Sequence, residues 1–99
     1  MTTKSLDVGC GSNPRNPFNA DELHGLDVFD HQLPNFKVCD LILDKLPYED
    51  NTFDYITFFD VLEHIPRLIY IGRERKTPFI DLMNEAHRVL KPGGTAIIS

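Results

Sequence analysis

The chain has 99 residues and a net charge of −5, which allows one domain and argues against a nucleic-acid-binding protein. Apolar residues make up 41% and charged residues 25%, a composition typical of globular rather than disordered proteins. No apolar run reaches the roughly 18 residues that span a bilayer, and two cysteines cannot build a disulfide scaffold. We therefore expect one cytoplasmic domain over residues 1–99, with neither a nucleic acid nor a membrane as partner.

Five short apolar runs predict buried strands that are separated by turns. The fourth run, FDYITFF, is rich in β-branched and aromatic residues and gives the strongest strand signal. Strands that are apolar almost throughout are typical of a parallel sheet covered on both faces, so the sequence predicts an α/β fold. The five runs are residues 5–8, 25–29, 36–42, 53–59 and 95–99.

One long helix is predicted between the last two strands. Thr77 can cap it, Pro78 suits its first position, and the turn at Pro92-Gly93 ends it. Glu85 and Arg88 are expected to form a surface ion pair on this helix. Its apolar stripe comprises Phe79, Leu82, Met83, Ala86 and Leu90.

The remaining connections are expected to be short. A shorter helix is predicted from about Asp60 to Pro66. Pro14 and Pro17 oppose a regular helix after Gly11, and the segment between residues 29 and 36 is too short for a crossover helix. We therefore expect loops there and a sheet with one face less well covered.

Charge is distributed unevenly along the chain. Residues 21–54 contain nine acids and two lysines, whereas residues 67–76 contain four basic residues and one acid. Two interpretations of the basic segment stay open. It is either a solvated loop or a substrate-facing lid that favours an anionic group.

A glycine turn follows the first predicted strand and indicates a ligand site. In LDVGCG (6–11), glycines allow backbone N–H groups to approach a ligand closely. Asp27, at the end of the second strand, can accept hydrogen bonds from ribose hydroxyls. A dinucleotide site would place a third glycine at Pro14, so the pattern favours S-adenosylmethionine over NAD. A NAD-binding Rossmann domain remains the less favoured alternative.

Five sequence blocks resemble the N-terminal part of class I S-adenosylmethionine-dependent methyltransferases. The resemblance implies a Rossmann-like parallel sheet with strand order 3-2-1-4-5, lacking the last two strands of the family. We therefore expect either a domain truncated after its fifth strand or an exposed strand edge that a second copy or a partner covers. The blocks are LDVGCG (6–11), GLD (25–27), CDL (39–41), LPYEDNTFDYITFFDVLEHI (46–65) and RVLKPGG (88–94).

The resemblance also implies roles for residues at the carboxyl ends of the strands, where ligands of open α/β sheets bind. The residues implied around the methionine part of the cofactor are Asp7, Gly9, Cys10 and Gly11. Those implied around its ribose and adenine are Asp27, Val28, Phe29, Asp40 and Leu41. Those implied beside the sulfonium centre are Phe59 and Asp60.

The expected function is methyl transfer to an unidentified small-molecule, sugar or lipid acceptor. No catalytic residue is identified: His64 could act as a general base, but the favoured interpretation is a helix-end histidine that has no catalytic duty. The histidines and cysteines lack metal-ligand spacing, so no metal site is expected. Cys10 and Cys39 are expected to be free thiols, since a strand separates them. A catalytically incomplete binding or scaffold domain is the alternative function.

Overall fold

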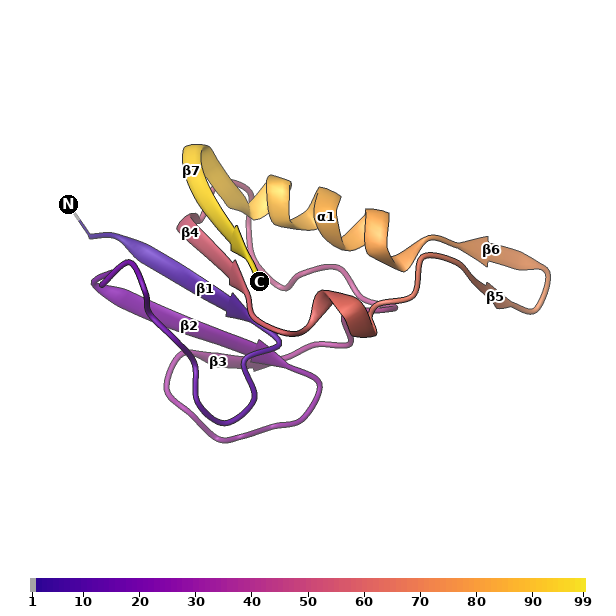
Figure 1. Ribbon diagram of the computed structural model, residues 1–99, viewed down its shortest axis with the longest axis horizontal. Coiled ribbons are helices and arrows are strands. Elements are labelled where there is room, and N and C mark those ends of the chain that lie inside the picture. The colour runs from indigo at the N-terminus through magenta and orange to yellow at the C-terminus, as the bar shows by residue number, and fades with distance from the viewer. Residues whose placement is uncertain (1) are drawn as a thin grey trace.

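The computed structural model describes residues 2–99, in which a five-stranded parallel sheet lies beside one α-helix (Figure 1). The strand order is β3-β2-β1-β4-β7, and every neighbouring pair is parallel. This confirms the predicted Rossmann-like sheet and its order, with β7 as the fifth strand. The sheet strands are β1 (Lys4–Val8), β2 (Glu22–Asp27), β3 (Phe36–Val38), β4 (Phe53–Phe58) and β7 (Leu90–Ile98).

The core lies between the central strands and helix α1 (Pro78–Val89), which Figure 1 shows alongside β4 and β7. Because neighbouring strands and the packed layers remove them from water, the apolar side chains of β1 and β4 are almost fully buried. A stripe along α1 completes the cluster. The principal members are Leu6, Val8, Ile56, Phe58, Leu82, Ala86 and Val89.

Helix α1 begins as predicted but ends earlier. Thr77 occupies the N-cap position and Pro78 is the first helical residue, yet the Thr77 side chain makes no capping hydrogen bond. Strand β7 begins directly after the helix. The pairing of β4 with β7 shifts register across the segment 91–94, in which Gly93 has a φ of 81°. The predicted KPGG turn is therefore a bulge inside a strand.

Two strands differ in extent from the prediction because of local turns. The second strand begins three residues earlier than expected and stops at Asp27. The third stops at Val38 rather than at residue 42. There, Asp40 Oδ1 accepts hydrogen bonds from the backbone N–H groups of Ile42 (2.9 Å) and Leu43 (3.3 Å). This aspartate turn reverses the chain and competes with the strand.

The helix predicted from Asp60 is wrong. Only a 3-10 turn, η1 (Leu62–His64), forms after β4. Asp60 has a φ of 55°, which is left-handed backbone that cannot start a helix, and its N–H donates to Ser99 O (3.0 Å). As predicted, no helix forms in residues 12–21 or 28–35.

The basic segment 67–76 forms an antiparallel hairpin of β5 (Ile69–Ile71) and β6 (Glu74–Lys76), two strands that neither the loop nor the lid interpretation included. Figure 1 shows it projecting beyond the N-terminal end of α1. The turn is Gly72-Arg73, and Gly72 has a φ of 63°. A two-residue turn with glycine first, between IYI and ERK, is a hairpin signal that could have predicted it.

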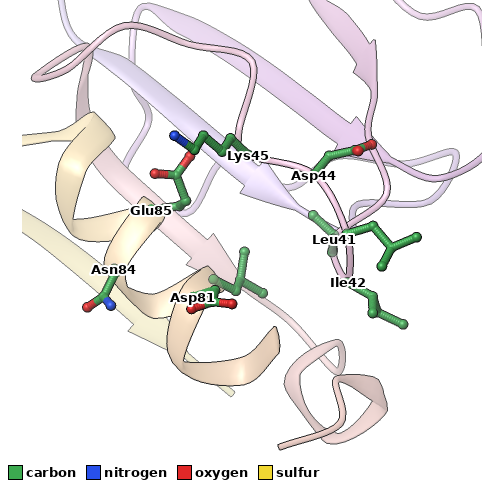
Figure 2. Close-up of a pocket in the computed structure, with 9 residues that line it drawn as sticks. Leu41, Ile42, Asp44, Lys45, Asp81, Asn84 and Glu85 are labelled. Atoms are coloured by element: carbon green, nitrogen blue, oxygen red, sulfur yellow. The ribbon is translucent and has the colours of Figure 1, made fainter. Parts of the chain in front are cut away.

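Helix α1 also holds the segment that precedes β4. Both Glu85 carboxylate oxygens accept from Arg88 (2.8 and 3.0 Å), whose guanidinium also donates to the carbonyl oxygens of Leu46 (2.9 Å) and Tyr48 (2.8 Å). The expected surface pair is therefore the centre of a partly buried network. A hollow lies beside it, between the turn 41–45 and α1, where Lys45 points toward Glu85 (Figure 2).

Candidate functional site

Two cavities lie at the carboxyl ends of the strands and meet at Gly9, which lines both. Ten of the eleven predicted cofactor residues line one or the other, and Gly11 does not. The small cavity, about 210 Å³, is lined by Asp7, Gly9, Cys10, Ser12, Asn13, Arg15 and Phe59. The large cavity, about 550 Å³, is lined by Gly9, Asp27, Val28, Phe29, Asp40, Leu41, Ile42, Asp60, Val61, His64 and Ile65.

The glycine turn after β1 forms the junction of the two cavities. Gly9 and Gly11 have φ values of 69° and 61°, and the N–H groups of Gly9 and Cys10 both donate to Leu26 O on β2 (2.7 and 3.1 Å). A Cβ atom on Gly9 would lie 2.9 Å from Val61 Cβ. Both the left-handed backbone and this close neighbour therefore require glycine at position 9.

Asp27 joins the glycine turn to the end of β2. Its Oδ2 accepts from Gly11 N–H (2.6 Å) and its Oδ1 accepts from Val28 N–H (2.6 Å). An ionised carboxylate has about four acceptor positions, so capacity remains toward the large cavity that Asp27 lines. The carboxylate can thus hold the turn and bind hydroxyl groups at the same time.

Asp7 is 2% exposed and fixes the loop that closes the small cavity. Its Oδ2 accepts from Arg15 N–H (2.8 Å), and its Oδ1 accepts from the Thr57 hydroxyl (3.0 Å). Burial raises the pKa of Asp7, and the hydrogen bonds from Arg15 and Thr57 oppose that rise. The side chain is a buried acceptor with two fixed donors.

Arg15 lines the candidate site but was not among the residues predicted from the sequence. Its guanidinium carbon lies 4.9 Å from the centroid of the Phe59 ring, which places a cation over the residue predicted beside the sulfonium. Arg15 is the one Lys or Arg that lines either cavity. The sequence held one clue to it. The segment SNPRNP, in which no helix is predicted, begins at the carboxyl end of the first strand, so its arginine can lie near the strand ends.

The large cavity combines carboxylates with apolar side chains. Asp40 lines it from the turn after β3, although its Oδ1 is already used by that turn. Asp60 lines it from the end of β4. Val28 and Leu41 contribute apolar surface to the same cavity. Such a mixture suits a flat, largely apolar group with a few polar atoms.

The lining residues give the site a negative charge. Across the two cavities, four acidic residues (Asp7, Asp27, Asp40 and Asp60) face one guanidinium, a formal balance of −3. A site of this sign favours a ligand that carries positive charge.

His64 lies at the rim of the large cavity with its side chain 76% exposed. Its Nε2 is 3.6 Å from Glu63 Oε1, and a catalytic role for it stays a prediction. Cys10 and Cys39 are free thiols, as expected, and burial raises the pKa of each to about 11. In residues 2–99 no group of three or more His, Cys, Asp or Glu side chains could hold a metal ion.

Comparison with known proteins gives a family match. A family model described as "Methyltransferase domain" matches residues 6–98. Demethylmenaquinone methyltransferases from Geobacillus sp. (strain WCH70) and Bacillus mycoides (strain KBAB4) are 30% and 31% identical to the chain over 112 and 113 residues. These matches cover 95% and 96% of this chain and 43% of each relative, so the chain spans less than half their length.

A solved structure shows the same fold. The S-adenosylmethionine-dependent methyltransferase from Mesorhizobium loti superposes with a TM-score of 0.70 at 20% identity, over 98% of this chain and 46% of that one. With the family match over almost the whole sequence, the chain belongs to the class I S-adenosylmethionine-dependent methyltransferases.

Proposed function

We propose that the chain binds S-adenosylmethionine across the two cavities that meet at Gly9, in an enzyme that transfers its methyl group to a small-molecule acceptor. The observation that carries this proposal is the division of the site. One cavity presents an acid and a guanidinium, and the other presents carboxylates among apolar side chains. This division fits a ligand with an amino-acid end and a nucleoside end.

The small cavity fits the amino-acid end. Asp7 offers carboxylate oxygens to an ammonium group, and the Arg15 guanidinium offers donors to a carboxylate. The Arg15 backbone N–H donates to Asp7, and the Arg15 guanidinium lies over the Phe59 ring, so both side chains border the same cavity. In this assignment the two side chains recognise opposite charges on the same ligand.

The large cavity fits the nucleoside end. Asp27 would accept from the ribose hydroxyls with the acceptor positions that the glycine turn leaves free. Val28 and Leu41 would lie against the adenine, and Asp40 would accept from its amino group. Backbone groups of Gly9, Cys10 and Gly11 would bind the methionine part of the ligand, as the family resemblance implies.

When bound, S-adenosylmethionine supplies an activated methyl group on a positively charged sulfur. Phe59 and Asp60 follow β4 directly and line the two cavities on either side of their junction, where that sulfur is expected. The surrounding carboxylates favour the cationic donor over its neutral product. The protein's main task is to align the acceptor and exclude water, and His64 would act as a base only for an acceptor that must lose a proton.

The NAD alternative is less well supported. Residues 12–21 contain no helix whose N-terminus could hold a pyrophosphate. Instead, Pro14 packs over β2, where its Cγ would lie 3.2 Å from a Cβ atom built on Gly25.

The nature of the acceptor is a separate part of the proposal. Because the two relatives are demethylmenaquinone methyltransferases, demethylmenaquinone is the first acceptor to test, before sugars and other lipids. The cytoplasmic location and a partner at the β7 edge stay predictions. In residues 2–99 no helix combines the length and the apolar character that crossing a membrane requires.

Calorimetric titration with S-adenosylmethionine, S-adenosylhomocysteine and NAD tests the proposal. We expect both sulfur compounds to bind, the cationic donor more tightly, and NAD not to bind. Binding of NAD alone would contradict the proposal. Binding of the donor without turnover on any acceptor would favour the alternative of a binding or scaffold domain.

A further inference from the structure

The β5–β6 hairpin carries apolar side chains that nothing in the described chain covers. Four large apolar residues in and beside it are about half exposed or more: Leu68 (49%), Tyr70 (68%), Ile71 (48%) and Ile80 (57%). A two-stranded hairpin without a covering layer is at best marginally stable in water. The exposed cluster at this projecting end therefore indicates a contact surface.

The charge of the hairpin is opposite to that of the rest of the chain. Residues 67–76 contain four cations and one carboxylate, a balance of +3, so the other 89 residues carry −8. Glu74 pairs with Lys76 (3.0 Å), whereas Arg73 and Arg75 form no ion pair within residues 2–99. An anionic surface would therefore attract this basic segment and repel the rest of the chain.

The apolar side chains lie on both faces of the hairpin. Tyr70 and Ile71 are consecutive strand residues, so they point to opposite faces. Tyr70 lies directly opposite Arg75, and Ile71 directly opposite Glu74. A protein partner would cover one face, whereas a lipid interface surrounds an inserted tip on all sides. Tyrosine and aliphatic residues next to arginine are also the types that suit the boundary between headgroups and acyl chains.

Although the composition led us to expect no membrane partner, we propose that the β5–β6 hairpin docks the protein onto anionic lipid membranes. Tyr70, Ile71 and Leu68 enter the interface, while Arg73 and Arg75 bind lipid phosphates. Figure 1 places the hairpin beyond η1, on the side toward which the arrowheads of β1, β2 and β3 point. Both cavities lie at those strand ends, so they are on the side of the molecule that carries the hairpin.

Vesicle cosedimentation of the full chain tests this inference. The probes are vesicles of phosphatidylcholine alone and of phosphatidylcholine with phosphatidylglycerol. We expect binding to the anionic vesicles only, weakened by salt. The double variant Arg73→Gln/Arg75→Gln should bind about 25-fold more weakly, since each interfacial cation contributes about fivefold. Tyr70→Ser/Ile71→Ser should also reduce binding.

A matched double variant controls for net charge. Lys4→Gln/Lys45→Gln removes two positive charges outside the hairpin and should bind like the parent chain. Equal binding of all variants, absence of binding to anionic vesicles, or binding to an acidic protein such as polyglutamate instead would overturn the inference. Cofactor titration of the same samples keeps the two proposals apart, because the hairpin residues named here line neither cavity.

Discussion

Replacing Asp27 by asparagine tests the carboxylate that joins the glycine turn to β2. Its two oxygens each accept from a backbone N–H group at 2.6 Å, from Gly11 and from Val28. An asparagine has one acceptor oxygen, so its NH₂ group would face one of those donors. Because a hydrogen bond to a charged group contributes roughly 1.5–3 kcal/mol, the variant should lose about 1–2 kcal/mol of unfolding free energy at this partly exposed site.

The same change should weaken S-adenosylmethionine binding by about 1–3 kcal/mol, or roughly 5- to 150-fold, because ribose hydroxyls would lose a charged acceptor. Urea unfolding measures the first effect, and calorimetry on the folded variant measures the second. Asp21→Asn is the matched control, since Asp21 also accepts from a backbone N–H, that of Thr3, but lies outside both cavities. A folded Asp27→Asn variant that keeps the parent affinity would refute the ribose assignment.

Further predictions concern the buried acid, the glycine turn and the α1 network. Asp7→Asn keeps an acceptor for Arg15 N–H, so the variant should fold, yet calorimetry should show donor affinity at least about tenfold weaker. Gly9→Ala should cost more than about 2 kcal/mol in urea unfolding, from strain and from its contact with Val61. Arg88→Ala should cost about 2–4 kcal/mol, because two carbonyl oxygens and Glu85 lose donors. Hydrogen bonding to Arg88 lowers the pKa of Glu85. The contribution of the Glu85–Arg88 pair to the free energy of unfolding should therefore be complete above about pH 4.3, the usual pKa of an unfolded glutamate, and be lost as pH falls through the lowered pKa. In thermal melts, the melting temperature of the Arg88→Ala variant should fall less than that of the parent chain over that pH range.

The strand pattern and the position of the candidate cavities could be predicted because they depend on local sequence. The apolar runs around Leu6 and Ile56 identify the central strands. The glycine turn after the first strand and Asp27 at the end of the second identify the edge of the sheet at which a ligand would bind. The structure brings those residues to two adjoining cavities. Their roles toward the cofactor stay predictions.

The errors arise where a single side chain or backbone angle overrides the pattern. Asp40 ends β3 with its own turn, and the left-handed backbone of Asp60 prevents the predicted helix. Arg15 enters the site through a loop whose path depends on the buried acceptor Asp7, which no periodicity reveals. The Arg88 network likewise joins segments about forty residues apart.

A crystal structure of the chain with S-adenosylhomocysteine is the most direct measurement of the proposed binding mode. Our account predicts the sulfur beside Gly9, the amino-acid end between Asp7 and Arg15, and the adenosine in the cavity lined by Asp27 and Asp40. The ligand in the hollow between the turn 41–45 and α1, or with its two ends exchanged, would contradict it.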